Sequence, residues 1–574
     1  MKKDVKRSVL TAVLAAALTL SMTACGSTDA GSSAAESQSA QSAESSAAES
    51  SQTGTTEGKD SESTADGGTA EADADAHVAV TANEPNVLDV VRFLGIADRN
   101  VFYNVLEPLT RVENGAVVAA GAESWEVSEN GLTYTFHLRE NYWNDGQKVV
   151  SGDYAEALYR QADPANNYAF ASDIYCIENF KEAFNGEATV DSIGVETPDD
   201  DTLVLHLNAP SPALLSTFDF FPERADYVEK YGDALGTEAE SVAACGPFVL
   251  DSWVHNSELT FSKNDKYWDK DNVKLQSFAF EVITDSAASF AALQAGTIDY
   301  LTLTDIDNIE TLQADENLEG VSVEGARTYM FVFNGKDELF QNEKVRRAFS
   351  LALDRETIVE DLYNGLGTPA YGLIPAASSV GDLRYRDYVE EPLKSAAEDP
   401  VELLNEGLSE LGISSPSDVT VTLSFGSTGA TTKLYGEYYQ QTWQAALGVN
   451  VELSFNDSTT HMANIKSGDY QIALTSWGAN LEPQFLLTRW VGGGQHKVDN
   501  ETFDAYTNEA ITTMDDQKRL ELYGEAEKEL VDSAMIAPIY YGGSMRFQYK
   551  FVKGIADNQF DTTGMKTVYT AERP

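Results

Sequence analysis

The chain reads Ala122-Glu-Ser-Trp-Glu-Val-Ser-Glu-Asn-Gly-Leu-Thr-Tyr-Thr-Phe-His-Leu-Arg139 where its fold class is clearest. Residues 132–138 alternate apolar and polar side chains, which predicts a half-buried β-strand. The alternation recurs at 202–207, 259–262, 420–424 and 451–455. Apolar residues at helical spacing mark 345–353, 356–362, 433–447 and 517–531. The two periods follow one another irregularly, so the sequence predicts a mixed α/β protein, neither a TIM barrel nor a repeat array.

The length of the chain predicts more than one core. Its 574 residues, 42% of them hydrophobic and 10% aromatic, suit globular packing from about residue 77 onward. A folded part of this size exceeds what one compact core supports, so we expect two or three lobes.

The N-terminus has the layout of a secretory signal. A basic start is followed by an apolar run from Val9 to Leu20 and then by Met22-Thr-Ala-Cys25. The run is shorter than the roughly 20 residues of a membrane-spanning helix. Its ending resembles a bacterial lipobox, which implies a signal peptide over 1–24 and a lipid on Cys25 that holds the protein on the outer face of the cytoplasmic membrane. An ordinary cleaved signal with an incidental cysteine is the alternative.

Residues 25–76 are predicted to form a disordered tether. From Gly26 to Ala76 the chain is almost entirely Ser, Ala, Glu, Thr, Gly, Asp and Gln, without an aromatic residue. Such a composition cannot bury enough apolar surface to offset the entropy lost on ordering.

The net charge of −53 excludes two classes of partner. So acidic a surface repels nucleic acid phosphates and anionic lipid headgroups, and membrane contact is expected through the lipid alone. The remaining cysteines, Cys176 and Cys245, either form a disulfide outside the cytoplasm or stay as buried thiols. The chain lacks CxxC, HExxH and clustered histidines, so we expect neither a metal site nor a cofactor.

Catalytic signatures are missing from the sequence. It contains no GxSxG elbow, no GxxxxGK[ST] loop and no GxGxxG after a strand. We therefore expect a protein that is not an enzyme, with an extracellular hydrolase as the remote alternative.

Four groups of motifs occur in order along the chain. They are Trp125 with Phe136-His-Leu-Arg139 and Trp143-Asn-Asp-Gly146; Cys245-Gly-Pro-Phe248 with Lys263-Asn-Asp-Lys-Tyr-Trp-Asp269; Asn342 to Arg347 with Leu351-Ala-Leu-Asp-Arg355; and Trp477-Gly-Ala-Asn-Leu-Glu-Pro483 with Ala537-Pro-Ile-Tyr-Tyr541. Together they resemble the extracytoplasmic solute-binding proteins of peptide and nickel ABC importers (family 5), especially the oligopeptide-binding lipoproteins. No single motif is decisive, but the ordered set is specific.

The resemblance implies a two-lobed α/β periplasmic-binding-protein fold (type II, cluster C) with an extra domain in the first lobe. Lobe I is expected at 77–112, 190–326 and 537–574, the extra domain at 113–189 and lobe II at 327–536. Such proteins are monomers that close on a ligand in the cleft between the lobes and deliver it to ABC permease subunits.

The resemblance also implies which residues hold the ligand. In oligopeptide binders a Trp-x-Ala-Asp run supplies an aspartate that pairs with the amino group of the peptide. The matching residues here are Trp477, Gly478 and Asn480. Asn480 is neutral and loses the charge-assisted part of that bond, and Glu482 is the nearby acid that would substitute for it. The rest of the cleft is predicted to include Tyr541, Tyr168 and Asn264.

We expect the function to be capture of (oligo)peptides for import. The alternatives within the same fold are a nickel–chelator complex, haem or a sugar oligomer as ligand. A surface lipoprotein that serves adhesion or signalling is the alternative outside transport.

Overall fold

The computed structural model describes residues 76–113, 115–303, 308–556 and 564–571. All of them belong to the larger of two compact units, Ala43–Pro574. The predicted signal peptide, the lipidation site Cys25 and the tether before residue 76 lie outside the described residues.

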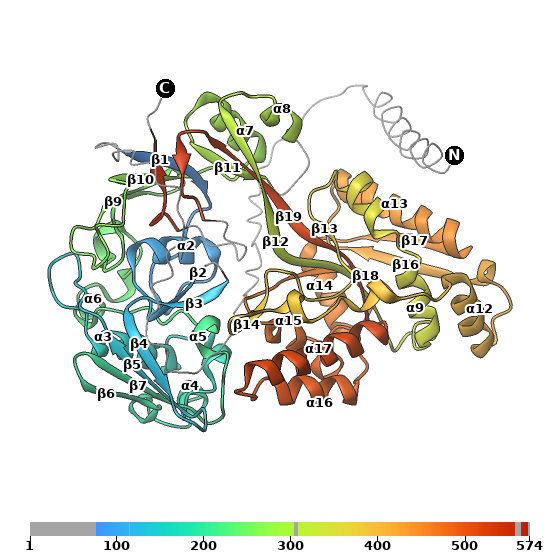
Figure 1. Ribbon diagram of the computed structural model, residues 1–574, viewed down its shortest axis with the longest axis horizontal. Coiled ribbons are helices and arrows are strands. Elements are labelled where there is room, and N and C mark those ends of the chain that lie inside the picture. The colour runs from blue at the N-terminus through green and yellow to red at the C-terminus, as the bar shows by residue number, and fades with distance from the viewer. Residues whose placement is uncertain (1–75, 114, 304–307, 557–563, 572–574) are drawn as a thin grey trace, which may run out of the picture. The chain divides into compact units, whose positions relative to one another are not determined.

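A mixed sheet of eleven strands runs through this unit (Figure 1). Its strands are β1 (His77–Ala82), β8 (Phe248–Val254), β9 (Glu258–Lys263), β10 (Ser277–Val282), β11 (Tyr300–Leu303), β12 (Leu318–Phe333), β13 (Thr368–Pro369), β16 (Thr420–Phe425), β17 (Asn450–Phe455), β18 (Ile472–Gly478) and β19 (Ile536–Tyr549). The order across the sheet is β17-β16-β18-β12-β19-β11-β1-β10-β9-β8, and β13 pairs with β19.

Parallel and antiparallel pairs are combined in this sheet. β1 is parallel to β10 and β11, and β16 is parallel to β17 and β18. The chain crosses from β10 to β11 through α7 (Ser286–Ala295) and from β16 to β17 through α13 (Ala430–Leu447). Parallel strands need such crossovers. The predicted mixed α/β class is confirmed.

A second sheet contains the stretch from which the fold class was predicted. It consists of β4 (Ala122–Val127), β5 (Thr133–Leu138), β6 (Val195–Asp199) and β7 (Thr202–His206) in the antiparallel order β4-β5-β7-β6. Helices α3 (Ser151–Ala162) and α4 (Phe180–Phe184) accompany it. The expected domain boundary at residue 189 falls between β5 and β6 of this sheet. β7 hydrogen-bonds along β5 and buries Leu203 and Leu205, so the sheet continues to His206.

The remaining elements are short or cover the sheets. The helices are α2 (Ile96–Val105), α5 (Leu214–Thr217), α6 (Ala225–Tyr231), α8 (Ile309–Gln313), α9 (Glu343–Leu351), α10 (Arg355–Thr357), α11 (Tyr385–Tyr388), α12 (Pro400–Glu410), α14 (Ser458–Ser467), α15 (Gln484–Thr488), α16 (Glu501–Ala510) and α17 (Asp516–Asp532). Three two-stranded pairs are β2 (Thr110–Glu113) with β3 (Ala116–Ala119), β14 (Ser379–Val380) with β15 (Leu383–Arg384), and β20 (Val552–Lys553) with β21 (Tyr569–Thr570).

The predicted helices are confirmed. They correspond to α9, α13, α17 and, for 356–362, to α10 followed by the π-helical turn Ile358–Leu362.

The second region, residues 334–535, buries both faces of its part of the large sheet. Successive strand residues point to opposite faces. Phe331 therefore packs against Trp443 of α13 on one face, with ring centroids 4.9 Å apart. Met330 joins the core on the other face, where α16 and α17 lie.

Most of the first region, residues 76–303, shares one apolar core, whereas Leu293, Ile298, Leu301 and Leu303 belong to a separate cluster around β11. Phe136 of the small sheet and Phe278 of the large sheet both belong to the shared core. The small sheet is therefore joined to the first region by a shared core.

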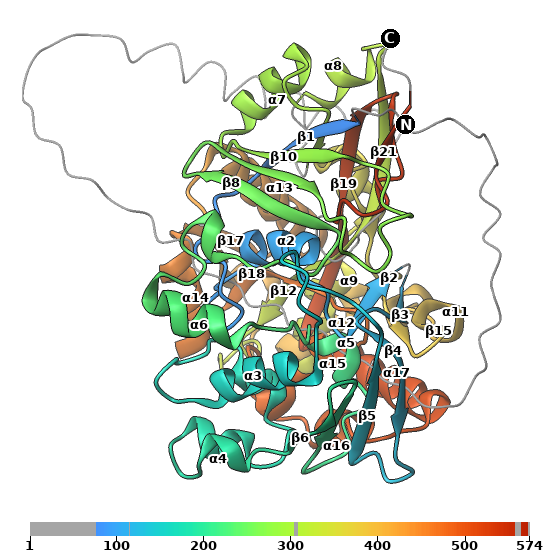
Figure 2. The same ribbon diagram turned by 90° about the vertical axis from the view of Figure 1, so that its left-hand side faces the viewer.

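β12 and β19 link the two regions and run side by side in Figures 1 and 2. β12 pairs with β18 of the second region, and β19 pairs with β11 of the first. Their register slips in the middle, where residues 325–327 lie opposite the single residue Gly542. Such a bulge bends and twists a strand pair. A Cβ on Gly325 would lie 1.8 Å from the carbonyl oxygen of Gly542, so this close approach requires glycine.

We expect Gly325→Ala to lower the melting temperature. The added methyl group overpacks the bulge, which costs about 1–3 kcal/mol. The control is Gly152→Ala in α3, where a Cβ would meet only Val150 Cγ2 at 3.9 Å. Thermal unfolding of both variants is the measurement, and equal melting temperatures would contradict the role of the glycine contact.

Candidate functional site

Trp477 lies half-buried at the end of β18 and packs against the core beneath α16 and α17. The guanidinium group of Arg489 lies 3.9 Å from the centroid of its indole ring and 4.0 Å from the ring of Phe485. Phe485 and Arg489 are four residues apart in and just after α15, a spacing that places side chains on one helix face. A cation is thus held between two aromatic rings, which attract it through their π-electron faces.

A second arginine lies at the same strand end. Arg327 pairs in register with Gly478, and its Nη1 donates to Ser476 Oγ at 3.2 Å. A Cβ on Gly478 would be 3.6 Å from Arg327 Nη2, which is an ordinary contact. The β18 end therefore carries two cationic side chains in a chain of strongly negative net charge.

Asn480 lies in the loop after β18, next to the strands that link the two regions. The preceding amide, Ala479 N–H, donates to the carbonyl of Ala326 in the β12 bulge at 2.5 Å. Ser378 Oγ donates to the carbonyl of Asn480 at 3.2 Å. The Asn480 side chain is 5% exposed, and its Nδ2 is buried without a hydrogen-bond partner. An unsatisfied buried donor costs about 1–3 kcal/mol, and such groups recur at functional sites.

Glu482 is occupied inside the second region. Its side chain is 0% exposed, and Arg519 donates to Oε1 through Nε at 2.9 Å and Nη2 at 2.8 Å. The hydroxyl of Tyr523 donates to Oε2 at 3.1 Å. Burial raises the pKa of Glu482 to about 7, and the charge of Arg519 opposes this rise. A ligand would have to displace Arg519 to reach this carboxylate.

Tyr541 is also internal. Its hydroxyl lies 2.7 Å from Glu391 Oε1 and 3.1 Å from the carbonyl of Gly372, and the residue is 5% exposed. Burial raises the pKa of Tyr541. The residue fixes the chain around Gly372 against β19.

Tyr168 and Asn264 belong to the first region. Tyr168 packs in the core with Phe170 and Phe218 at centroid distances of 5.8 and 6.4 Å. Asn264 is 2% exposed; its Nδ2 donates to Gly246 O at 2.9 Å and its Oδ1 accepts from Lys266 N at 3.0 Å. Of the predicted site residues, Trp477 and Gly478 end β18 and Asn480 follows in the next loop, while the other four make internal contacts. Contact between a ligand and any of these seven residues stays a prediction.

The positive charge of Arg489 affects the pKa of one residue of the first region, Asp173. Burial raises the pKa of Asp173, in the short turn Ala171–Ile174, to about 6, while Arg489 and Arg99 lower it. Arg99 is itself paired with Asp219. Sequence reasoning did not single out Arg489, although its spacing from Phe485 was a usable signal; Asp173, in an irregular turn, offered none.

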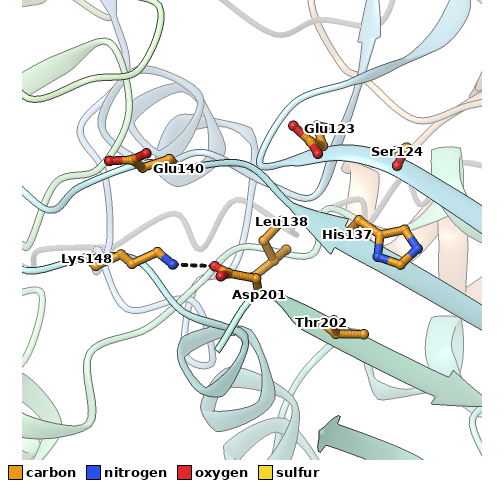
Figure 3. A pocket seen from close by; sticks show the side chains of 8 residues that line it. All are labelled: Glu123, Ser124, His137, Leu138, Glu140, Lys148, Asp201 and Thr202. Atoms are coloured by element: carbon orange, nitrogen blue, oxygen red, sulfur yellow. Dashed lines mark hydrogen bonds and ion pairs between the residues drawn. The ribbon is translucent and has the colours of Figure 1, made fainter. Parts of the chain in front are cut away.

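A polar hollow of 460 Å³ lies on the small sheet, and no predicted site residue lines it (Figure 3). Its lining residues are Glu123, Ser124, His137, Leu138, Glu140, Lys148, Asp201 and Thr202. Lys148 forms an ion pair with Asp201, so the hollow retains the charges of Glu123 and Glu140.

Three further findings concern the expectations from composition. Within the described ranges no group of three or more His, Cys, Asp or Glu side chains is placed to hold a metal ion. Cys245 is buried and is not joined to Cys176 by a disulfide. In the part of the chain that the structure describes, no helix combines the length and apolarity needed to cross a membrane.

Arg519→Met should be strongly destabilising. It leaves the buried carboxylate of Glu482 without its cation, which costs about 3–5 kcal/mol. The adjacent Lys518 forms an exposed ion pair with Glu509, so Lys518→Met should change the free energy of unfolding by less than about 1 kcal/mol. Denaturant unfolding measures both, and a small effect of Arg519→Met would show that the pair adds little.

The pH dependence of stability should reveal Asp173. Its folded pKa of about 6 lies above its ordinary value, so its contribution to stability is fully present below that ordinary value and is lost as the pH rises through about 6. The melting temperature of the wild type relative to Asp173→Asn should therefore fall between pH 4 and pH 7. Asp226, whose pKa is lowered by Arg224, should give the opposite trend in Asp226→Asn. A flat Asp173 difference would contradict the raised pKa.

The chain matches known proteins over most of its length. The family model of bacterial extracellular solute-binding proteins, family 5 Middle, matches residues 116–497. The oligopeptide-binding protein OppA of Bacillus subtilis is 30% identical, with 80% of this chain and 87% of OppA covered. A probable deoxycholate-binding periplasmic protein of Escherichia coli, YgiS, is 27% identical over 82% of this chain and 89% of its own length.

Solved structures of a murein tripeptide-binding protein, MppA, share the fold. The unliganded open form is 25% identical and has a TM-score of 0.76, with 88% of this chain and 98% of that chain covered. Another MppA structure, of the Escherichia coli protein, also 25% identical, has a TM-score of 0.68 and covers 88% and 100%. These matches confirm the expected family and fold, and this chain belongs to the bacterial extracellular solute-binding proteins of family 5, which bind solutes and are not enzymes.

Proposed function

We propose that this protein is the substrate-binding lipoprotein of an ABC importer. It captures peptides between its two regions and passes them to the permease subunits. A lipid on Cys25 anchors it to the outer face of the cytoplasmic membrane, and the acidic segment up to residue 76 serves as the tether. The protein acts as a monomer.

The observation that carries this proposal is the placement of Asn480. The residue occupies the motif position that holds a peptide end in oligopeptide binders, and its Nδ2 is a buried donor without a partner. The adjacent hydrogen bond from Ala479 to Ala326 ties the loop to the linking strands. A ligand that satisfies Asn480 would thus be coupled directly to the bulge between the regions.

The linking strands support capture by hinge closure. Two strands with a bulge at residues 325–327 allow the regions to turn relative to one another, as in other two-domain binding proteins. The fold is more similar to the open form of MppA than to the other MppA structure, with TM-scores of 0.76 and 0.68. We therefore propose lobe I at 77–112, 207–326 and 537–574, the extra domain of lobe I at 113–206, which keeps the small sheet whole, and lobe II at 327–536.

Peptide is the ligand class that the relatives favour. The B. subtilis relative is an oligopeptide-binding protein at 30% identity. Asn480 in place of an aspartate still permits a hydrogen bond to an end of a peptide, at about 1 kcal/mol instead of the about 1.5–3 kcal/mol of a charged pair. The YgiS relative makes deoxycholate a useful non-peptide comparison.

Thermal unfolding of the purified protein with pools of short, medium and long peptides tests the function. A ligand at 100 times its dissociation constant stabilises the folded state by about 2.7 kcal/mol. An upward shift with one pool supports peptide capture and identifies the length class. No shift with any peptide pool, together with a shift caused by deoxycholate, would replace the peptide proposal.

Asn480→Ala should weaken binding of the active peptide several-fold. The substitution removes one hydrogen bond, worth about 1 kcal/mol, from the ligand end. Titration calorimetry measures the effect, with Asn208→Ala as the control. Asn208 is exposed and donates to Tyr175 O at 2.8 Å in the first region, so its loss should leave affinity unchanged. Equal affinities of both variants and the wild type would remove Asn480 from the site.

A further inference from the structure

The turn between β4 and β5 lies against the second region. Its backbone is closed by a hydrogen bond from Gly131 N–H to the carbonyl of Ser128 at 2.8 Å. Asn130 is exposed, as expected in a hairpin turn, but its neighbour Gly131 is buried. A Cβ on Gly131 would lie 2.7 Å from Met514 Sδ and 3.1 Å from Pro210 Cβ, so the side chain of Met514 packs over this turn.

Met514 belongs to the turn between α16 and α17, and hydrogen bonds join this turn to the loop after β18. Arg519 Nη1 donates to the carbonyl of Thr513 at 2.8 Å. The same guanidinium group donates to Glu482 through Nε and Nη2. Glu482 follows Asn480 by two residues, so a displacement at Met514 is transmitted to the loop that carries Asn480.

A second turn of the first region approaches the same loop. A Cβ on Gly115, between β2 and β3, would lie 3.9 Å from Ser379 Oγ of β14. The amide of Ser379 donates to the carbonyl of Leu481 at 2.6 Å. Two turns of the first region therefore lie close to elements that hydrogen bonds link to residues 479–483.

The electrostatics of Tyr134 support the same arrangement. This residue of β5 lies three positions after Gly131, and burial raises the pKa of its hydroxyl group. The charge of Arg519 opposes this rise, and the charge of Glu482 adds to it. The β4–β5 hairpin is therefore close enough to this ion pair of the second region for both charges to act on it.

We propose that Met514 and the β4–β5 turn form a latch that holds the two regions together and positions the loop of Asn480. A contact that exists in one arrangement of the regions and is lost in another shifts the population toward the first arrangement. The latch lies outside the linking strands, so it adds a further connection between the regions. Its effect on ligand affinity rests on the proposed function, which assigns Asn480 to the ligand site, whereas the contact itself does not.

Disulfide trapping tests the contact in solution. In Gly131→Cys combined with Met514→Cys, the two Cβ atoms come close to the separation of about 3.5–4.5 Å that a disulfide requires. The control pair is Gly186→Cys with Met514→Cys, because Gly186 has a similar φ of +74°, against +67° for Gly131, and a Cβ there would meet nothing within 4 Å. Diamide is the oxidant, and it takes up two hydrogens as two thiols give one disulfide.

We expect the first pair to form its disulfide about tenfold faster than the control pair, because groups held in contact react fastest. Mass spectrometry of the digested protein identifies the disulfide between the two substituted positions. Cys176 and Cys245 are common to both pairs and contribute equally to the background. Equal rates would overturn the latch.

Hydrogen exchange of the ligand-free protein tests the latch without a substitution in the turn. Met514→Ala should make the amides of residues 128–134, which lie in the other region, exchange about threefold faster than in the wild type. The control is Met462→Ala, because Met462 is also half-buried but packs against the core of its own region. Unchanged exchange of residues 128–134 in Met514→Ala would overturn the latch, since a role confined to the second region leaves these amides unaffected.

Titration calorimetry with the active peptide tests the link to the ligand site. Met514→Ala should weaken binding about three- to tenfold, and Met462→Ala less than about twofold, because loss of the latch lowers the population of the binding-competent arrangement. Faster exchange of residues 128–134 with an unchanged affinity would overturn the positioning of the loop of Asn480. If no peptide binds, peptide capture fails, and disulfide trapping and hydrogen exchange still decide whether the latch exists.

Discussion

The arrangement of the two regions depends on one close backbone approach, between Gly325 and the carbonyl oxygen of Gly542. It lies in the strand pair that links the two regions. Each linking strand is hydrogen-bonded into a different half of the large sheet, so the two halves are joined through one long strand pair. The bulge at 325–327 lies where that pair loses register. Because Ala326 also accepts from the amide of Ala479, the loop that carries Asn480 follows any bend at this point.

The charged residues near the proposed site differ in how deeply they are buried. Glu482 and Arg519 neutralise one another where no solvent reaches them, whereas Arg489 is half-buried and its charge opposes the rise in the pKa of Asp173 in the first region. A buried ion pair contributes little net stability but becomes costly when one member is lost. Acidic composition therefore says little about which acids are available to a ligand, and the 92 carboxylates of this chain cannot be assigned from the sequence alone.

Local patterns predicted local structure well. Strict alternation identified β5 and β7, and helical spacing identified α13 and α17. The pairing of β5 with β7, which are about 70 residues apart, could not be predicted because alternation within a strand does not encode its partner. At the site, a sequence motif alone identified the segment from Trp477 to Asn480. The position of Arg489 between two aromatic rings and the pairing of Glu482 with Arg519 depend on tertiary packing, which no local pattern in the sequence encodes.

The position of β19 has a consequence for the order of folding. This strand lies near the C-terminus, at Ile536–Tyr549, yet it occupies the middle of the large sheet between β12 and β11. Until β19 is present, β12 and β11 each keep an open edge of unpaired amides and carbonyls. Exposed edges of this kind recruit other chains and promote aggregation, and pairing so distant in sequence forms slowly. A chain that stops before Ile536 thus consists of two half-sheets, each with an exposed edge that can pair with other chains.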